Sequence, residues 1–90
     1  MKLSVIIPIY NEKLTCKKLI KKVHSVPIQK QIIVVDDGST DGTNNILNQI
    51  NGIELITHSS NLGKGSAIQS AIPYIQGDFV ILQDGDLEYN

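Results

Sequence analysis

Cysteine, aromatic residues and long apolar runs are all scarce in this chain of 90 residues. Because Cys16 has no second cysteine to pair with, the sequence excludes a disulfide framework and a cysteine-built zinc site, and it is consistent with a reducing cytosol. No apolar run approaches the roughly 20 residues that span a bilayer. The N-terminal run is short and interrupted by Pro8, so it predicts a strand rather than a signal peptide. We therefore expect a cytoplasmic location.

Basic charge is also too scarce for a protein whose main partner is nucleic acid. The formal net charge is −1, whereas binding to phosphate backbones requires a basic surface. The charges are unevenly placed, since seven of the eight lysines lie in the first thirty residues, and the last thirteen residues contain four acids and no base. The lysine-rich segment is compatible with an acidic membrane surface, although a solvated helix face is the simpler interpretation.

The sequence does contain four short, β-branched apolar runs, at residues 3–7, 31–35, 53–57 and 79–82. Such nearly continuous runs are typical of strands that are covered on both faces in a parallel sheet. The segments between them repeat apolar residues at helical spacing. We predict one α/β domain over residues 1–90, with an open, mainly parallel sheet of four strands and helices on both faces. Pro73 should end the third helix near Ile72, because proline lacks the N–H that a helix interior needs.

A polar turn follows each of the four predicted strands. The turns read PIYNE after the first strand, DDGSTDG after the second, NLGKG after the third and DGD after the fourth. In an open parallel sheet, ligands bind beyond the carboxyl ends of the strands. A solvated loop explains any one of these turns, but four of them at one edge of the sheet indicate a binding site.

The DGD turn is the candidate metal site. Asp84 and Asp86 stand one residue apart after an apolar strand, so both carboxylates can reach one hard divalent cation, and Gly85 between them allows close approach of a ligand. Mg²⁺ or Mn²⁺ would offset the repulsion between this acidic edge and a diphosphate, and would stabilise a leaving diphosphate as a Lewis acid. Two acids at this spacing are a weak signal by themselves, and an ordinary acidic turn is the alternative.

The other three turns hold the remaining candidates for nucleotide binding. Asp36 and Asp37 follow a buried strand, where carboxylates need hydrogen-bond donors such as those of a nucleotide base and ribose. Tyr10 offers an aromatic face and Glu12 a carboxylate, with a surface tyrosine and a first-turn helix acid as the alternative. Lys64 lies between two glycines at a predicted helix N-terminus, where backbone N–H groups favour anions such as phosphate.

Taken together, these motifs resemble those of glycosyltransferase family 2. The matching segments are PIYNE, VVDDGSTDGT, NLGKG and GDFVILQDGDLEY, in the family's order and over essentially the whole chain. They are most similar to the branch of polyprenyl-phosphate (dolichyl-phosphate) mannosyl- and glucosyltransferases. The resemblance implies a GT-A fold with strand order 3-2-1-4. This chain would be its nucleotide-sugar-binding N-terminal part, without the half that binds the acceptor.

The resemblance also implies roles for individual residues. Asp84 and Asp86 would be catalytic and would hold the diphosphate and the metal, with Glu88 as a further metal ligand. With Lys64 added from the residues themselves, the predicted nucleotide-sugar-binding set is Pro8, Tyr10, Glu12, Val35, Asp37, Lys64, Asp84, Gly85 and Asp86.

The expected reaction is an inverting displacement at the anomeric carbon of a UDP- or GDP-sugar. The acceptor implied by the resemblance is a polyprenyl phosphate or a glycan, and membrane association would come from segments beyond residue 90, at the cytoplasmic face. Two other interpretations stay open. One is a nucleotide-binding fragment without catalytic activity. The other is a receiver-type signalling domain, which also pairs acids at strand ends but places that pair after its first strand.

Overall fold

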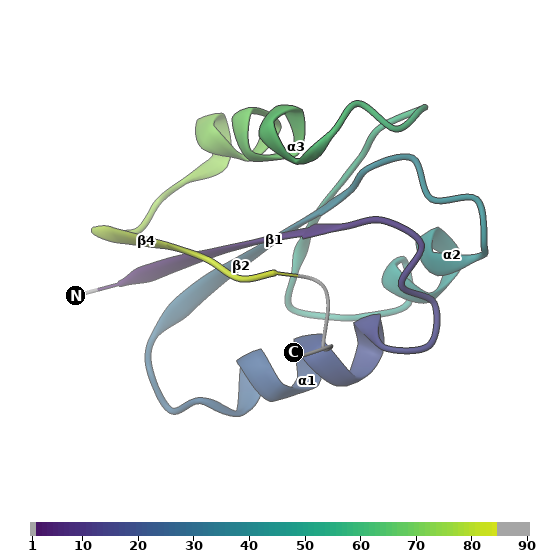
Figure 1. Cartoon of the computed structure of the whole chain (residues 1–90). Helices are drawn as coiled ribbons and strands as arrows, with labels where there is room; N and C mark the ends of the chain where they lie inside the picture. Colours follow the sequence, from purple (N-terminus) through teal and green to yellow (C-terminus); the bar gives the residue numbers. More distant parts are fainter. Residues whose placement is uncertain (1, 85–90) are drawn as a thin grey trace, which may run out of the picture.

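The computed structural model describes residues 2–84, and strands alternate with helices along the chain (Figure 1). The elements are β1 (Leu3–Ile9), α1 (Cys16–Ser25), β2 (Lys30–Asp36), α2 (Thr43–Leu47), β3 (Glu54–Thr57), α3 (Lys64–Ala71), the 3₁₀ turn η1 (Ile72–Tyr74) and β4 (Phe79–Leu82). The alternation confirms the predicted α/β class. Each strand lies within two residues of the apolar run that predicted it.

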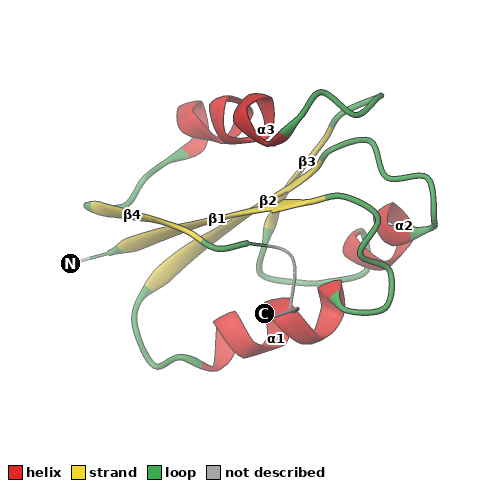
Figure 2. Ribbon diagram, in the orientation of Figure 1, coloured by secondary structure: helices red, strands yellow, loops and turns green. Residues whose placement is uncertain are grey.

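The four strands form one parallel sheet in the order β3-β2-β1-β4. This order confirms the one implied by the family resemblance. Figure 2 shows α3 on one face of the sheet and α1 and α2 on the other, which confirms the prediction of helices on both faces. Because all four strands run in the same direction, their carboxyl ends lie along one edge of the sheet.

Two separate apolar clusters hold the helices on the sheet, since successive side chains of a strand point to opposite faces. On the α1 face, alternate residues of β1 such as Ile7 pack with Leu19 and Ile20 of α1. On the α3 face, Ile6 and the facing residues of β2 pack with Ala67 and Ala71, both fully buried.

Pro73 lies in η1, so α3 ends at Ala71, close to the predicted Ile72. The chain leaves regular helical geometry where the proline would remove a hydrogen bond. This confirms the predicted early end of the third helix.

Strand β4 differs from the expectation that every strand is covered on both faces. All four of its residues are exposed, with exposed fractions of 44% to 54%. Within residues 2–84, β4 pairs with β1 along one edge only, at the end of the sheet. The prediction was wrong because an apolar sequence shows that a strand tends to be covered, but does not show which element covers it.

A buried glutamine ties the chain before β4 to the sheet, and its removal gives a first prediction. The side-chain amide of Gln31 donates to the carbonyl of Tyr74 at 2.6 Å, and its oxygen accepts from the backbone N–H of Gln76 at 2.9 Å and from the hydroxyl of Ser4 at 2.7 Å. Gln31→Leu removes all three hydrogen bonds, so that the Tyr74 carbonyl and the Gln76 N–H lose these partners and the hydroxyl of Ser4 keeps only the N–H of Gly77. We expect a loss of about 2 kcal/mol in the free energy of unfolding. Urea denaturation measures it.

Gln69→Leu is the matched control, because Gln69 is exposed on α3 and none of the described hydrogen bonds uses its side chain. Surface changes of this kind usually stay within about 0.5 kcal/mol. Equal stability of the two leucine variants would contradict the role assigned to Gln31.

Candidate functional site

The carboxyl ends of β1, β2 and β4 border a cleft of about 440 Å³. This volume lies within the range of roughly 300–1,000 Å³ that is typical of small-ligand pockets. The residues that line it are Pro8, Ile9, Tyr10, Glu12, Asp37, Asn61, Gly63, Lys64 and Asp84. The cleft therefore lies at the edge of the sheet where the polar turns were expected to meet.

Most of the predicted nucleotide-sugar-binding residues border this one cleft. Those that line it are Pro8, Tyr10, Glu12, Asp37, Lys64 and Asp84. Val35 does not line it, because its side chain is fully buried in the cluster beneath α3. Gly85, Asp86 and Glu88 lie outside the described residues.

Three residues of the predicted turns line the cleft although they were not in the predicted nucleotide-sugar-binding set: Ile9, Asn61 and Gly63. Asn61 and Gly63 belong to the same NLGKG motif as Lys64. That motif was therefore sufficient to find them, had the prediction extended from the lysine to its neighbours. Ile9 carries no chemical signal, and only its position at the end of the first strand places it there.

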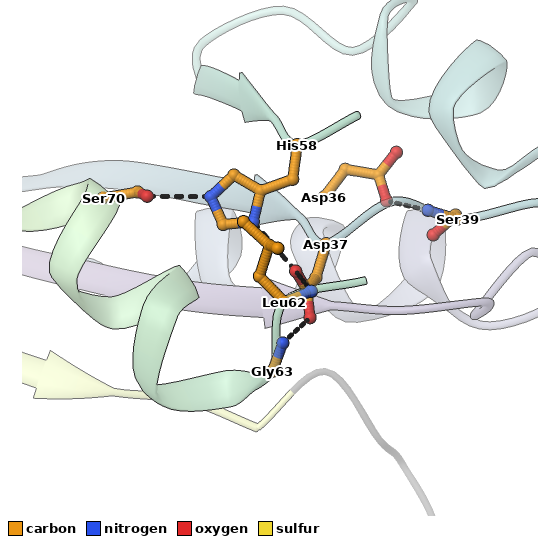
Figure 3. A network of polar contacts seen from close by, with 7 residues as sticks. All are labelled: Asp36, Asp37, Ser39, His58, Leu62, Gly63 and Ser70. Carbon is orange, nitrogen blue, oxygen red and sulfur yellow. Dashed lines mark hydrogen bonds and ion pairs between the residues drawn. The ribbon is translucent and has the colours of Figure 1, made fainter. Parts of the chain in front are cut away.

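Asp37 is held at the floor of the cleft by groups of the protein itself (Figure 3). Its Oδ1 accepts hydrogen bonds from the backbone N–H of Leu62 at 2.9 Å and contacts Nδ1 of His58 at 2.8 Å, and its Oδ2 accepts from the backbone N–H of Gly63 at 2.9 Å. A carboxylate has about four acceptor positions. One position on Oδ2 therefore remains for a ligand.

These contacts also keep Asp37 ionised. Burial raises the pKa of its carboxyl, but the hydrogen bonds from His58, Leu62 and Gly63 together outweigh burial and hold the pKa below its usual value. A negative charge in contact with two successive backbone N–H groups fixes the loop that leads into α3. The Asp37 carboxylate thus determines the position of one wall of the cleft.

His58 extends this network to α3. Its Nε2 lies 2.8 Å from the hydroxyl of Ser70, while its Nδ1 faces Asp37, so the ring links α3 to the residue that follows β2 (Figure 3). The imidazole side chain is 9% exposed. The sequence contained no ligand-like spacing for His58, and its partners come from segments 12 and 21 residues away.

The carboxylate oxygens of Asp36 also find hydrogen-bond donors within the protein. Its two oxygens accept from the backbone N–H of Ser39 at 3.1 Å and from the side-chain amide of Asn44 at 2.8 Å, and the residue is 1% exposed. The donors that the sequence required for Asp36 and Asp37 therefore include groups of the protein itself. Backbone and side-chain groups of this chain solvate both carboxylates.

Tyr10 and Glu12 form the wall contributed by the turn after β1. Tyr10 is 42% exposed, which leaves its ring accessible from the cleft. One carboxylate oxygen of Glu12 accepts from the hydroxyl of Thr15 at 2.9 Å, and the backbone carbonyl of Glu12 accepts from Cys16 at 2.8 Å. Glu12 thus orders the first turn before α1 and keeps its second carboxylate oxygen available.

Lys64 and Asp84 form an ion pair across the mouth of the cleft. Lys64 is the first residue of α3, and Asp84 follows β4. Both side chains are more than half exposed, at 55% and 66%, and exposed pairs contribute only about 0–1 kcal/mol. A ligand that carries its own charges can therefore separate them at little cost.

Of the three predicted metal ligands, only Asp84 lies among the residues that the structure describes. Asp84 offers hard oxygen ligands of the type that Mg²⁺ and Mn²⁺ prefer. Within residues 2–84, no group of three or more His, Cys, Asp or Glu side chains is placed to hold a metal ion. The donor chemistry of Asp84 fits a divalent cation, and the other two predicted ligands, Asp86 and Glu88, lie outside that range.

No described helix combines the length and the apolar character that crossing a membrane requires.

Two solved structures with this fold are a mannosyltransferase and a glucosyl-3-phosphoglycerate synthase. The chain superposes with a TM-score of 0.87 and 25% identity on a mannosyltransferase from Pyrobaculum calidifontis in complex with GDP-Man and Mn²⁺, over 93% of this chain and 27% of that one. It superposes with a TM-score of 0.76 and 29% identity on glucosyl-3-phosphoglycerate synthase from Mycobacterium tuberculosis in complex with Mn²⁺, UDP and glucosyl-3-phosphoglycerate, over 94% and 33%. The fold and the cleft therefore define a glycosyltransferase of the GT-A class.

Within that class the sequence identifies the family. The model of Glycosyl transferase family 2 matches residues 4–90, and the chain belongs to this family. Undecaprenyl-phosphate 4-deoxy-4-formamido-L-arabinose transferase of Edwardsiella ictaluri (strain 93-146) is 35% identical over 94 residues, an alignment that covers 94% of this chain and 29% of that protein. The chain thus spans less than a third of the length of this relative.

Proposed function

We propose that this protein is a metal-dependent transferase that binds a UDP- or GDP-sugar in the cleft and passes the sugar to an acceptor by inverting displacement. One observation carries the proposal: Tyr10, Asp37 and Asp84 follow three different strands, Lys64 begins α3, and all four line a single cleft. In this proposal residues 1–90 form the part that binds the nucleotide sugar, and the acceptor is bound by another part of the protein.

The nucleoside would lie against the turns after β1 and β2. The exposed ring of Tyr10 offers a face for the base. The remaining acceptor positions of Asp37 and Glu12 suit base N–H groups or ribose hydroxyls, because each carboxylate keeps one oxygen that is not saturated by the protein. Held this way, the nucleotide presents its diphosphate to the mouth of the cleft.

The diphosphate would lie between Lys64 and Asp84. Lys64 exchanges its exposed pairing with Asp84 for a phosphate oxygen, and the backbone N–H groups at the start of α3 favour the same negative charge. Asp84, Asp86 and Glu88 are the residues proposed to hold Mg²⁺ or Mn²⁺, which when bound offsets the charge of the leaving diphosphate. Both solved relatives described above hold Mn²⁺ together with a nucleotide or nucleotide sugar.

The proposed acceptor is a polyprenyl phosphate at the cytoplasmic face of a membrane. The name of the curated relative specifies undecaprenyl phosphate as its substrate. A phosphate oxygen of such a lipid is already anionic, so it can attack the anomeric carbon without a protein base. A bond then forms between that carbon and the acceptor oxygen while the bond to the nucleoside diphosphate breaks, and orientation supplies much of the rate.

Thermal unfolding with nucleotide and metal tests donor binding. We expect UDP or GDP together with Mn²⁺ to raise the melting temperature. A ligand at 100 times its Kd adds about 2.7 kcal/mol of stability, which is a shift of roughly 10 °C or more for a domain of this size. Asp84→Asn and Asp86→Asn should each remove most of the metal-dependent part of the shift.

Asp78→Asn is the control, because Asp78 is an exposed acid outside the cleft that accepts a hydrogen bond from the backbone N–H of Lys2. This variant should keep the full shift. Absence of a metal-dependent shift with both nucleotides would contradict the proposal. A shift without sugar transfer by the 90-residue chain would favour the nucleotide-binding fragment.

A further inference from the structure

Every charged residue in the segment from Lys13 to Val35 is a lysine. This segment contains six lysines and no acid, whereas the rest of the chain contains two lysines and nine acids. The net charge of −1 therefore hides a segment of +6 and a remainder of −7. The acids of the cleft belong to the negative remainder.

The positive charge is concentrated on the outer side of α1. Lys17, Lys18, Lys21 and Lys22 are all exposed, while Cys16, Leu19 and Ile20 on the other side of the helix are buried against the sheet. Residues four apart lie on the same face of a helix, so the four lysines form two adjacent pairs along α1. Figure 2 shows α1 on the face of the sheet opposite α3, with its outer side unpacked by any described element.

No described acid neutralises these lysines. The ion pairs among residues 2–84 are His58 with Asp37 and Lys64 with Asp84, both away from α1. Four ammonium groups within three turns of helix repel one another. A partner with many negative charges removes this repulsion.

Apolar side chains flank the lysines at both ends of α1. Leu14, two residues before the helix, is 93% exposed, and Val26 and Ile28, just beyond its end, are 46% and 54% exposed. A cluster of four or more lysines on a helix is the composition that binds anionic lipid headgroups, and exposed aliphatic side chains beside such a cluster can add apolar contact with the bilayer. Binding to nucleic acid favours arginine and aromatic stacking, and residues 13–35 contain no arginine, phenylalanine, tyrosine or tryptophan.

We propose that the outer face of α1, defined by Leu14, Lys17, Lys18, Lys21 and Lys22, binds the surface of a bilayer that contains anionic phospholipids. The lysines contact lipid phosphates and Leu14 inserts among the upper acyl carbons. Leu14 follows the cleft residue Glu12 by two positions, so this docking brings the turn after β1, and with it one wall of the cleft, close to the membrane surface. The proposal goes beyond nucleotide binding and requires neither nucleotide nor metal.

Vesicle cosedimentation without nucleotide or metal tests the surface. We expect the chain to bind vesicles of equal parts phosphatidylglycerol and phosphatidylcholine, and to bind pure phosphatidylcholine far more weakly. Each lysine near an anionic surface contributes about a fivefold gain in partitioning. Lys→Gln at positions 17, 18, 21 and 22 together should therefore reduce binding by roughly 100-fold or more, and Leu14→Ser by about tenfold.

Two matched variants distinguish binding through this face from nonspecific binding to vesicles. Lys→Arg at the same four positions keeps the charge and should keep the binding. Ile72→Ser removes an exposed aliphatic residue of η1, directly after α3, and should have no effect. Circular dichroism establishes that each variant is folded.

Three results would overturn the proposal: equal binding to both vesicle types, unchanged binding of the glutamine variant, or tighter binding to a single-stranded RNA than to vesicles of the same phosphate concentration. Because the vesicle assay contains no nucleotide, a failure here is distinguishable from a failure of donor binding in the cleft.

Discussion

Replacing Gly38 with alanine is expected to lower the melting temperature by at least about 10 °C. Gly38 has φ of +75°, a left-handed conformation that costs other residues roughly 1–2 kcal/mol. The added methyl group would also meet backbone. It would contact the carbonyl carbon of Ser60 and lie 2.6 Å from the backbone nitrogen of Asn61, where nothing flexible can move aside. Overpacking of this kind adds roughly 1–3 kcal/mol.

The effect of Gly38→Ala should also reach the cleft. The backbone that the methyl group displaces leads directly to Asn61 and Gly63, which line the cleft, and to the two N–H groups that bind Asp37. We therefore expect the variant to lose nucleotide binding along with stability. Thermal unfolding followed by circular dichroism measures the first effect, and titration with UDP and GDP in the presence of Mn²⁺ measures the second.

Gly65→Ala provides the matched control for Gly38→Ala. A methyl group at Gly65 meets nothing within 4 Å, and this residue lies in the first turn of α3 without a positive φ. Alanine in a helix is favoured over glycine by about 0.5–1 kcal/mol, so the melting temperature should hold or rise. A fall of similar size in both variants would show that the close approach at Gly38 does not limit stability.

The fold was predictable from the sequence because its signals are local. The apolar runs identified the strands, the apolar repeat at helical spacing identified the helices, and Pro73 marked the end of α3. In α1 the repeating residues Cys16, Leu19 and Ile20 form the buried side. Each of these features is decided by the residue itself and its near neighbours. The strand order, in contrast, was implied by the family resemblance and not by any of these patterns.

The partners of Asp36 and Asp37 were not predictable, because they are tertiary contacts. The sequence showed two carboxylates after a buried strand and correctly required donors for them. The donors to Asp37 come from segments 21 to 26 residues further along the chain. Two of them are backbone N–H groups, which cannot be recognised from the residue type. The exposure of β4 escaped prediction for a related reason, since it depends on what packs beside the strand.

Asp37→Asn should destabilise the chain by about 3 kcal/mol, although the two side chains have nearly the same shape. The carboxylate accepts from three donors, and the amide replaces one acceptor oxygen with an NH₂ group. In either orientation of the amide, that NH₂ group faces the N–H of Leu62 or of Gly63. Hydrogen exchange of these two backbone amides should accelerate in the variant, and urea denaturation should show the loss in stability.

The pH dependence of this loss shows how much of it comes from the lost negative charge. Hydrogen bonds hold the pKa of Asp37 below its usual value despite burial, which raises it. The stability contributed by the ionised form is therefore complete above the pKa of an unfolded aspartate, about 3.9, and is lost as the pH falls through the lower folded pKa. The difference in stability between wild type and Asp37→Asn should be constant near neutral pH and narrow in acid.

A double-mutant cycle of Asp37→Asn with His58→Ala measures the coupling free energy between Asp37 and the imidazole. His58 contacts both Asp37 and Ser70, so removing either member of the Asp37–His58 pair leaves the other with an unmet partner in a buried site. The two substitutions together should cost less than the sum of the separate losses. Asp78→Asn and His24→Ala change an exposed acid and an exposed histidine and should be additive. Strict additivity of Asp37→Asn with His58→Ala would show that the histidine does not hold the carboxylate that anchors the wall of the cleft.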